Sequence, residues 1–288
     1  MIEKGPEFRP SPEEELFIPK ISPELLKNNY SIWRNHLHQC LEKQYPDFLE
    51  RKTHLKKFKD FVKFLPLVHT AFAVDLKNIF HVKKLESSFR LRKKGRESWQ
   101  TTTYPIDEKV GSDRYVFFNF GTGWVQGDVY LLFNQEKLKD PKTIASLEDI
   151  FRLHDLYHSL EEALEVYKKQ IFRGIDFPKI AALILANVYR NPQEYLSEKK
   201  GFPSEIIIPS VQFSDMFPSF EIKVLDEMPL NTLLGIVYPS EDPDMLRKIK
   251  EANVPDNQLI PFDSSVYKTI GEKKKAFNRL IYNESLKR

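Results

Sequence analysis

Two kinds of hydrophobic pattern alternate along the chain, and each predicts a different type of secondary structure. Between Ser22 and Leu65, apolar residues recur at helical spacing while most lysines fall on the other faces. Ser22 precedes a proline, which is a typical helix start because serine caps the first turn and proline fits within it. Pro46 and Pro66 should separate and end the helices. The sequence therefore predicts a helical N-terminal region, residues 1–66, that begins with a loosely docked arm.

After Pro66 the pattern changes to short apolar runs, which predict β-strands. Six runs are expected to be strands: residues 78–82, 114–120, 128–133, 205–209, 220–224 and 233–239. Helical periodicity interrupts them in an inserted block at about 145–199, with helices predicted at 146–172 and 178–198, and two more helices are predicted within 242–288. Long crossovers between the strands do not recur regularly, so the order favours an α+β fold over a doubly wound sheet. The sequence thus predicts a domain at 67–288 that carries a helical insertion.

The composition narrows the class of protein. The 288 residues, 41% hydrophobic and 13% aromatic, are enough for one large domain or for a core domain with an appendage. Lys plus Arg number 44 against 41 Asp plus Glu, and this near balance argues against a dedicated nucleic-acid binder. A single cysteine, Cys40, excludes an internal disulfide framework and suits a reducing compartment. The polar N-terminus is not a signal peptide, and no apolar stretch is long enough to span a membrane, so a soluble protein is expected.

One histidine pair has the spacing of metal ligands. His154 and His158 stand four residues apart in a predicted helix, where they would share one face. The zinc-protease pattern needs a glutamate after the first histidine, and Asp155 occupies that position, although Glu161 or Glu162 could supply a third ligand. An ordinary amphipathic helix explains the segment better, and no metal is expected.

Three further patterns favour structural roles. In "HLHQC", His36 and Cys40 can meet on a helix, but His38 points away from both. The basic run at 89–96 is typical of a solvated face, with a local phosphate site as the minor alternative. The glycine-rich segment at 121–127 lacks the lysine and the spacing of a phosphate-binding loop.

Polar residues embedded in the predicted strands are the remaining candidates for chemistry. His81 lies within an apolar run, Trp124 lies in the turn between two strands, and Glu205 directly precedes three isoleucines and Pro209. Glu205 is either a solvated strand end or a carboxylate that points into a cleft. The order of these segments favours the second interpretation.

Taken in order, the segments resemble an ADP-ribosyltransferase fold. In its His-Tyr-Glu branch, which includes poly(ADP-ribose) polymerases and DNA-modifying toxins of the DarT type, a first strand carries a histidine. Two apolar strands follow, and a later strand begins with the catalytic glutamate. The corresponding segments here are "IFHV", "YVFF", "GDVYLLF" and "SEIIIP", so the resemblance covers residues 78–133 and 200–240. It implies a split β-sheet core.

The sequence also departs from this family. Val82 and Lys83 follow His81, where the family often has Gly or Thr, and Trp124 is the nearest aromatic residue able to replace the expected tyrosine. The Arg-Ser-Glu branch stays open, because "QTTTY" weakly resembles its second strand. Pro203, however, stands where the first acidic residue of that branch's pair belongs.

The resemblance implies NAD as the substrate and a role for several residues. Glu205 would be the catalytic carboxylate, with Glu221 as its competitor; His81, Trp124, Phe117 and Tyr115 would bind NAD. Cleavage of the nicotinamide–ribose bond develops an oxocarbenium-like cation, which a nearby carboxylate stabilises. A histidine can hold the adenosine ribose, and an aromatic ring can stack on nicotinamide.

Glu205 is preferred over Glu221 for two reasons of local sequence. Its strand is the more apolar and ends at Pro209, as the family's strand does, whereas Lys223 suggests that Glu221 lies on an exposed edge strand. If His81 does not bind NAD, His69 in "VHT" is the next candidate.

The predicted function is mono-ADP-ribosyl transfer to a macromolecular target, with protein favoured over nucleic acid and with release of nicotinamide. The helical block at 145–199 is a candidate docking element for that target. The composition, rich in lysine and phenylalanine, suits a bacterial toxin or effector. Such a protein would act in the cytoplasm, or be translocated into a host cytosol without a classical signal peptide. The alternatives are a non-catalytic interaction protein and a metal hydrolase centred on His154 and His158.

Overall fold

The computed structural model describes Ile18 and residues 21–44, 47–95, 104–121, 128–197 and 220–287. The helices are α1 (Pro23–Gln44), α2 (Phe48–Val62), α3 (Ala73–Val82), α4 (Ser88–Lys93), α5 (Tyr104–Val110), α6 (Ile150–Tyr157), α7 (Leu160–Lys168), α8 (Phe177–Val188), α9 (Pro192–Ser197), α10 (Pro243–Glu251) and α11 (Ile270–Lys287). The strands are β1 (Leu67–Ala71), β2 (Lys84–Glu86), β3 (Tyr115–Phe120), β4 (Val129–Phe133), β5 (Ile144–Ser146), β6 (Ile171–Arg173), β7 (Glu221–Leu225), β8 (Glu227–Pro229), β9 (Leu233–Pro239) and β10 (Leu259–Phe262). The predicted strand at 205–209 lies outside the described residues.

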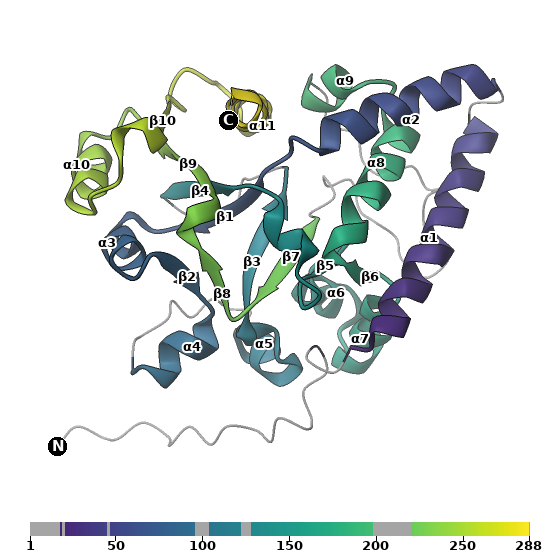
Figure 1. The fold of residues 1–288 in the computed structure, drawn as a ribbon, viewed down its shortest axis with the longest axis horizontal. Coiled ribbons are helices and arrows are strands. Elements are labelled where there is room, and N and C mark those ends of the chain that lie inside the picture. The colour runs from purple at the N-terminus through teal and green to yellow at the C-terminus, as the bar shows by residue number, and fades with distance from the viewer. Residues whose placement is uncertain are drawn as a thin grey trace.

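Eight strands form one mixed sheet in the order β10-β9-β4-β1-β3-β7-β5-β6, and β2 pairs with β8 in a second, two-stranded sheet (Figure 1). Among the described strands, β9 and β10 pair in parallel and all other neighbours are antiparallel. Helices and strands are mixed without regular crossovers, so the α+β prediction is confirmed.

The large sheet is split between β1 and β3. β1 pairs with β4 along its whole length, from Leu67 to Ala71. With β3 it shares only two residue pairs, Leu67 with Phe120 and Val68 with Asn119. Beyond Val68 the two strands no longer pair, so two four-stranded halves are joined by this short seam. Figure 1 shows β1 and β4 running across the direction of β3 and β7.

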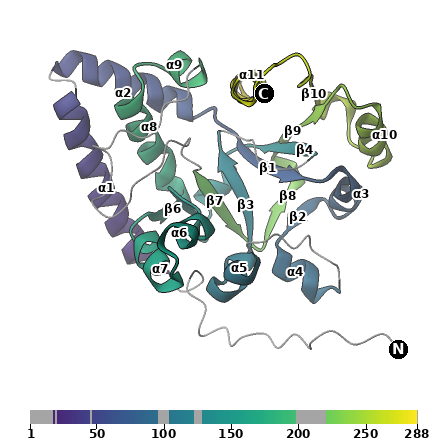
Figure 2. The ribbon, with the colours of Figure 1, turned by 180° about the vertical axis from the view of Figure 1, so that it is seen from behind.

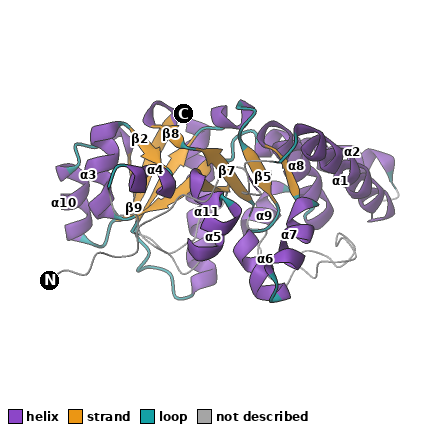
Figure 3. Ribbon diagram, turned by 90° about the horizontal axis from the view of Figure 1, so that it is seen from below, coloured by secondary structure: helices purple, strands orange, loops and turns teal. Residues whose placement is uncertain are grey.

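Alternation along β3 and β7 sorts their side chains onto two faces. Val116, Phe118, Phe120, Ile222 and Val224 enter the main hydrophobic core with residues of α1, α2, α3, α8 and α10. On the other face, Tyr115 packs in a second cluster with residues of α6 and α7. A third cluster joins β1, β4, β9 and β10 to α11. Figure 2 shows α1, α2 and α8 at one end of the molecule and α3 and α10 at the other, and Figure 3 shows the strands between them.

The N-terminal helices are docked on the rest of the chain by buried polar contacts. Trp33, only 2% exposed, donates from Nε1 to the carbonyl oxygen of Lys169 at 2.7 Å. Asn29 donates from Nδ2 to the carbonyl oxygens of Lys168 and Ile171 at 2.6 and 2.9 Å. These contacts order α1 against the β6 edge of the sheet. The predicted domain boundary at residue 66 stays a prediction.

Several predicted elements are confirmed at nearly their predicted positions. Helices α1 and α2 and strands β3, β4, β7 and β9 lie where the hydrophobic pattern placed them. Ser22 accepts a hydrogen bond from the amide of Leu25 at 3.1 Å, as its capping role requires. Within the described residues no helix is long and apolar enough to cross a membrane.

The predicted strand at 78–82 is wrong, because these residues form the second half of α3. Ala73 and Leu76 are buried and Phe80 packs on the main core, which is the spacing of one helix face. The amide of Ala73 donates to Asp128 Oδ2 at 3.2 Å, and this contact holds the first turn of the helix. A five-residue apolar segment is too short to distinguish the periodicity of a helix from the alternation of a strand. The histidine-bearing strand of this region is instead β1, which the sequence pattern had not identified.

The predicted helical insertion is also corrected in part. Strands β5 and β6 flank α6 and α7 and extend the sheet beyond β7. Each has only three residues, which is too short for an alternation of apolar and polar residues to predict a strand. The block at 145–199 is therefore built into the sheet. At the C-terminus, α10 and α11 (which begins at Ile270) both lie within residues 242–288, where two helices were predicted.

Candidate active site at the split of the sheet

The split between β1 and β3 is bridged by a histidine. His69 on β1 contacts the carbonyl oxygen of Phe117 on β3 through Nδ1 at 2.8 Å. Because a carbonyl only accepts, Nδ1 carries the proton and Nε2 remains an acceptor. Burial lowers the pKa of His69 below its ordinary 6.5, against the opposing effect of the bond to Phe117. His69 is therefore a neutral imidazole at neutral pH, located where the two halves of the sheet diverge.

Glu221 is the first residue of β7 and lies beside this split. Its register partners are Asn119 on β3 and Ser146 on β5. Since Ile222 and Val224 enter the main core, Glu221 and its second neighbour Lys223 project from the opposite face. The Glu221 side chain is 12% exposed, so its carboxylate is largely shielded but still reaches solvent.

Lys223 is buried beneath this carboxylate. It is 1% exposed, and its Nζ contacts Oε2 of Glu221. The same ammonium lies 4.7 Å from the ring centroid of Phe117 and 5.6 Å from that of Tyr167, within cation–π range. Burial lowers the pKa of Lys223 to about 8, while Asp149 and Asp107 act in the opposite direction.

The burial of Lys223 corrects one premise of the comparison between the two glutamates. Lys223 was expected to mark an exposed edge strand, but β7 lies inside the sheet, between β3 and β5. Both neighbours come from distant parts of the sequence, and the local pattern of β7 could not reveal them. The strand that carries Glu221 is therefore internal to the sheet.

Lys223 should make the protein more stable as the pH rises from about 8 to about 10.5. The unfolded lysine keeps its proton up to the ordinary pKa of 10.5, whereas the folded one releases it near 8. The unfolded state binds more protons in this interval, so the free energy of unfolding increases, by roughly 3 kcal/mol for the whole shift. Urea unfolding across this range should show the increase in the parent and lose it in Lys223→Met. Parallel curves for the two proteins would contradict the assignment.

The other predicted site residues fall in different places. Phe117 lies at the site, against Lys223. Tyr115 is buried in the second cluster, and burial raises its pKa to about 12. Glu205 and Trp124 lie outside the described residues.

His81 is separate from this site. It is exposed on α3 and borders an open groove of about 990 Å³, which is also lined by Lys77, Lys83, Leu233 and Asn253. No residue of β3 or β7 lines this groove. The structure therefore does not bring His81 and Glu221 together.

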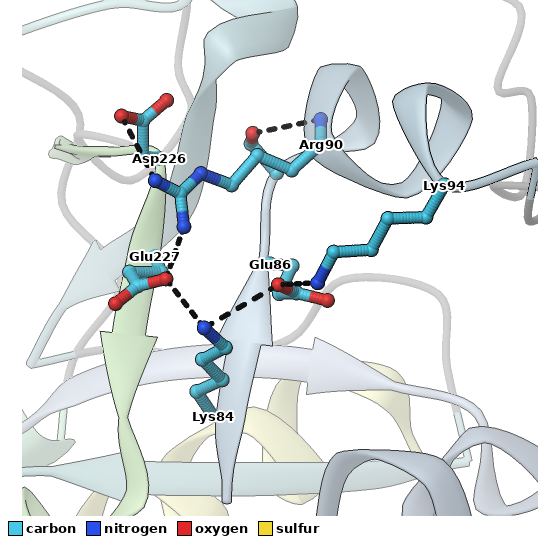
Figure 4. A network of polar contacts seen from close by, with 7 residues as sticks. Lys84, Glu86, Arg90, Lys94, Asp226 and Glu227 are labelled. Atoms are coloured by element: carbon cyan, nitrogen blue, oxygen red, sulfur yellow. Dashed lines mark hydrogen bonds and ion pairs between the residues drawn. The ribbon is translucent and has the colours of Figure 1, made fainter. Parts of the chain in front are cut away.

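The basic run at 89–96 lies at the surface in its described part, as predicted, and its side chains form ion pairs there (Figure 4). Arg90 contacts Glu227 and lies 3.5 Å from Asp226, and Lys84 contacts the same Glu227 at 2.8 Å. Lys94 pairs with Glu86 at 2.5 Å.

Arg92 of the same run pairs with the buried Asp113 at 2.5 Å. Asp113 directly precedes β3, so this ion pair holds α4 against the start of β3. Carboxylates from three separate segments thus compensate these cations, which leaves little charge for a phosphate. The run anchors α4 to the connection between β7 and β8.

The candidate metal ligands are not brought together. His158 terminates α6 with a left-handed backbone, φ 55°, so it leaves the helix face on which His154 lies. Among the described residues, no group of three or more His, Cys, Asp and Glu is arranged to hold a metal ion. In α1, Cys40 Sγ and His36 Nε2 are 3.6 Å apart, as their spacing predicted.

No family model matches the sequence, and no curated protein matches it. Three solved structures of DarT from Thermus sp. 2.9 are similar in fold, each covering 70% of this chain. The complex with ADP-ribosylated single-stranded DNA has 13% sequence identity, a TM-score of 0.39 and 96% of its own chain covered. The complexes with carba-NAD+ and NAD+ have 14% identity, TM-scores of 0.40 and 0.39, and 97% of their chains covered.

Proposed function

We propose that this protein is an NAD-dependent mono-ADP-ribosyltransferase, which releases nicotinamide and transfers ADP-ribose to a macromolecular acceptor. One observation carries the proposal. A shielded carboxylate, Glu221, begins an internal strand beside the split of the sheet, and an aromatic residue and a histidine, Phe117 and His69, flank the same split. This arrangement supplies the groups that the sequence resemblance requires.

The reaction needs a carboxylate in this position. The bond between C1′ of the ribose and the nicotinamide nitrogen breaks, and its electron pair leaves with nicotinamide. The ribose then carries the positive charge of an oxocarbenium-like state, which Glu221 would stabilise through space. A nucleophile of the acceptor bonds to C1′ and releases its proton to solvent. Since the Glu221 side chain is only 12% exposed, the charge–charge interaction is stronger there than in bulk solvent.

The choice of Glu221 over Glu205 follows from the geometry around β7. Glu221 pairs in register with Asn119 beside the split, and strand β7 begins with it, as the resemblance expects of the catalytic strand. Glu205 stays the competing assignment.

His69, rather than His81, should contribute to NAD binding. His69 lies at the split with Nε2 able to accept from a ribose hydroxyl, whereas His81 lies on α3. Loss of one such hydrogen bond costs about 1 kcal/mol, so His69→Ala should weaken NAD binding by roughly fivefold to tenfold. His81→Ala should bind NAD within twofold of the parent. Calorimetric titration of both variants measures this, with thermal unfolding as the check on folding; a larger effect of His81→Ala would return the site to α3.

The function itself is tested by incubating the purified protein with NAD labelled in the nicotinamide ring and, separately, in the adenosine. Release of nicotinamide, together with transfer of the adenosine label to an acceptor, is the expected result. Parallel reactions contain a protein extract, single-stranded DNA or no acceptor, because the class of acceptor decides which fraction becomes labelled. If NAD stays intact in every reaction, the protein is a non-catalytic interaction protein.

A further inference from the structure

We infer that Lys223 is a positioning residue for Glu221, whose carboxylate it keeps ionised and oriented toward the split of the sheet. The inference rests on the proposed function for its catalytic consequence. It adds a residue to the site that neither the sequence pattern nor the family resemblance had assigned to catalysis.

The geometry couples the two side chains directly. Glu221 and Lys223 are two residues apart on one strand, so both project from the same face of β7. Nζ of Lys223 contacts Oε2 of Glu221, and the rings of Phe117 and Tyr167 flank the ammonium. Because the lysine is 1% exposed and the glutamate 12%, solvent reaches the carboxylate and not the ammonium. Lys223 therefore supports the carboxylate from the protein side.

Burying the ammonium group of Lys223 lowers the stability of the fold unless other interactions compensate for its lost hydration. Transfer of an ammonium into a protein interior carries a penalty of several kcal/mol, and an apolar residue of similar volume is often equally stable. The cation–π contacts with Phe117 and Tyr167 offset part of that penalty. By contrast, an exposed ion pair such as Arg247 with Glu251 contributes little and needs no buried charge. The carboxylate at the split is the group that gains from the buried charge.

The pair predicts how activity depends on pH. The charged and titratable groups around Lys223 are Glu221 on its own strand, Asp107 of α5, Asp149 before α6 and Tyr167 of α7. Without the ammonium, Glu221 would face aromatic rings, and desolvation raises the pKa of a carboxylate. Glu221 would then take up a proton at a pH where the parent is still ionised. Loss of Lys223 should therefore reduce activity most at low pH.

The experiment compares Lys223→Met with the parent across pH 5 to 9 in the nicotinamide-release assay. The acid limb of kcat/KM should move upward by about one to three pH units. At pH 6 the variant should be at least about tenfold slower, and the deficit should shrink as the pH rises. A merely structural defect would lower the whole profile evenly. An acid limb at the parent's position would overturn the inference.

Lys84→Met is the matched control, because Lys84 also pairs with a glutamate. Its partner is Glu227, on the neighbouring strand β8, at 2.8 Å. Its pH profile should coincide with that of the parent. A shift equal to that of Lys223→Met would show that any lost lysine changes the profile, which would also overturn the inference.

A second measurement requires neither NAD cleavage by the protein nor correct folding of the Lys223→Met variant. In Glu221→Gln, loss of the carboxylate should lower the pKa of Lys223, so the rise in stability with pH should begin at lower pH than in the parent. Urea unfolding of the two proteins between pH 6 and 10.5 tests this coupling. Coincident curves would overturn the inference whether or not NAD is cleaved. Intact NAD with the parent protein would instead overturn only the proposed function.

Discussion

Replacing Glu221 by Gln should slow nicotinamide release at least about 100-fold, which corresponds to roughly 2.7 kcal/mol of transition-state stabilisation. Glutamine keeps the shape of the side chain and removes the charge that faces the developing cation. NAD affinity should change much less, since the positive charge on the ribose develops only in the transition state. Steady-state kinetics with labelled NAD separate the two effects. Because the substitution leaves Lys223 without its carboxylate, thermal unfolding of the variant must accompany the kinetics.

Two other glutamates serve as comparisons for this prediction. Glu227→Gln removes a carboxylate from β8 that pairs with Lys84 and Arg90, and it should stay within severalfold of the parent. Glu205→Gln should do the same if Glu221 is the active carboxylate. The opposite ranking would move the active carboxylate to Glu205 and make Glu221 a structural residue. Small effects from both Glu205→Gln and Glu221→Gln would exclude a transferase that acts through either carboxylate.

Replacing Trp33 by Ala should lower the free energy of unfolding by about 3 to 5 kcal/mol, the usual cost of truncating a buried aromatic side chain. The indole is 2% exposed, meets the ring of Phe172 edge-on at 6.3 Å, and donates its N–H to Lys169. The substitution removes buried apolar area and leaves a cavity between α1 and β6. Urea unfolding followed by circular dichroism should show one transition shifted to lower urea concentration.

The neighbouring Ile32 provides the control on the same helix. Its side chain is 56% exposed, so Ile32→Ala should change the free energy of unfolding by less than about 0.5 kcal/mol. The Trp33 result also tests the predicted boundary at residue 66. A variant in which residues 1–66 unfold early, while the rest keeps the parent's midpoint, would show that the N-terminal region is a separate domain.

The elements that could be predicted from sequence are those whose own residues decide their conformation. Ser22 caps its helix through a neighbour three residues away, and alternation along β3 sends Val116, Phe118 and Phe120 to one core. Such signals are local, so they survive without knowledge of the fold. The strands β3, β4, β7 and β9 and the α+β class followed from them.

The predictions of secondary structure were wrong where a short segment fits both helical and strand periodicity, or where a strand has too few residues to show alternation. Residues 78–82 are apolar enough for a strand, but their contacts with the main core make them the end of α3. Strands β5 and β6 have three residues each, and they exist because β7 and one another supply hydrogen-bond partners. Pairing of this kind is non-local, and no window of sequence contains both partners.

By itself, the sequence determined the types of most elements and a short set of candidate residues for NAD chemistry, including both glutamates. Only the tertiary structure decided how those residues are grouped. It puts His69 on β1 and Glu221 on β7, on either side of β3, leaves His81 on α3 beside a groove that no residue of β3 or β7 lines, and buries Lys223 inside the sheet. The physical reason is that burial and proximity depend on which strands become neighbours. That choice is made by contacts between residues far apart in the chain, such as Val68, Asn119 and Glu221.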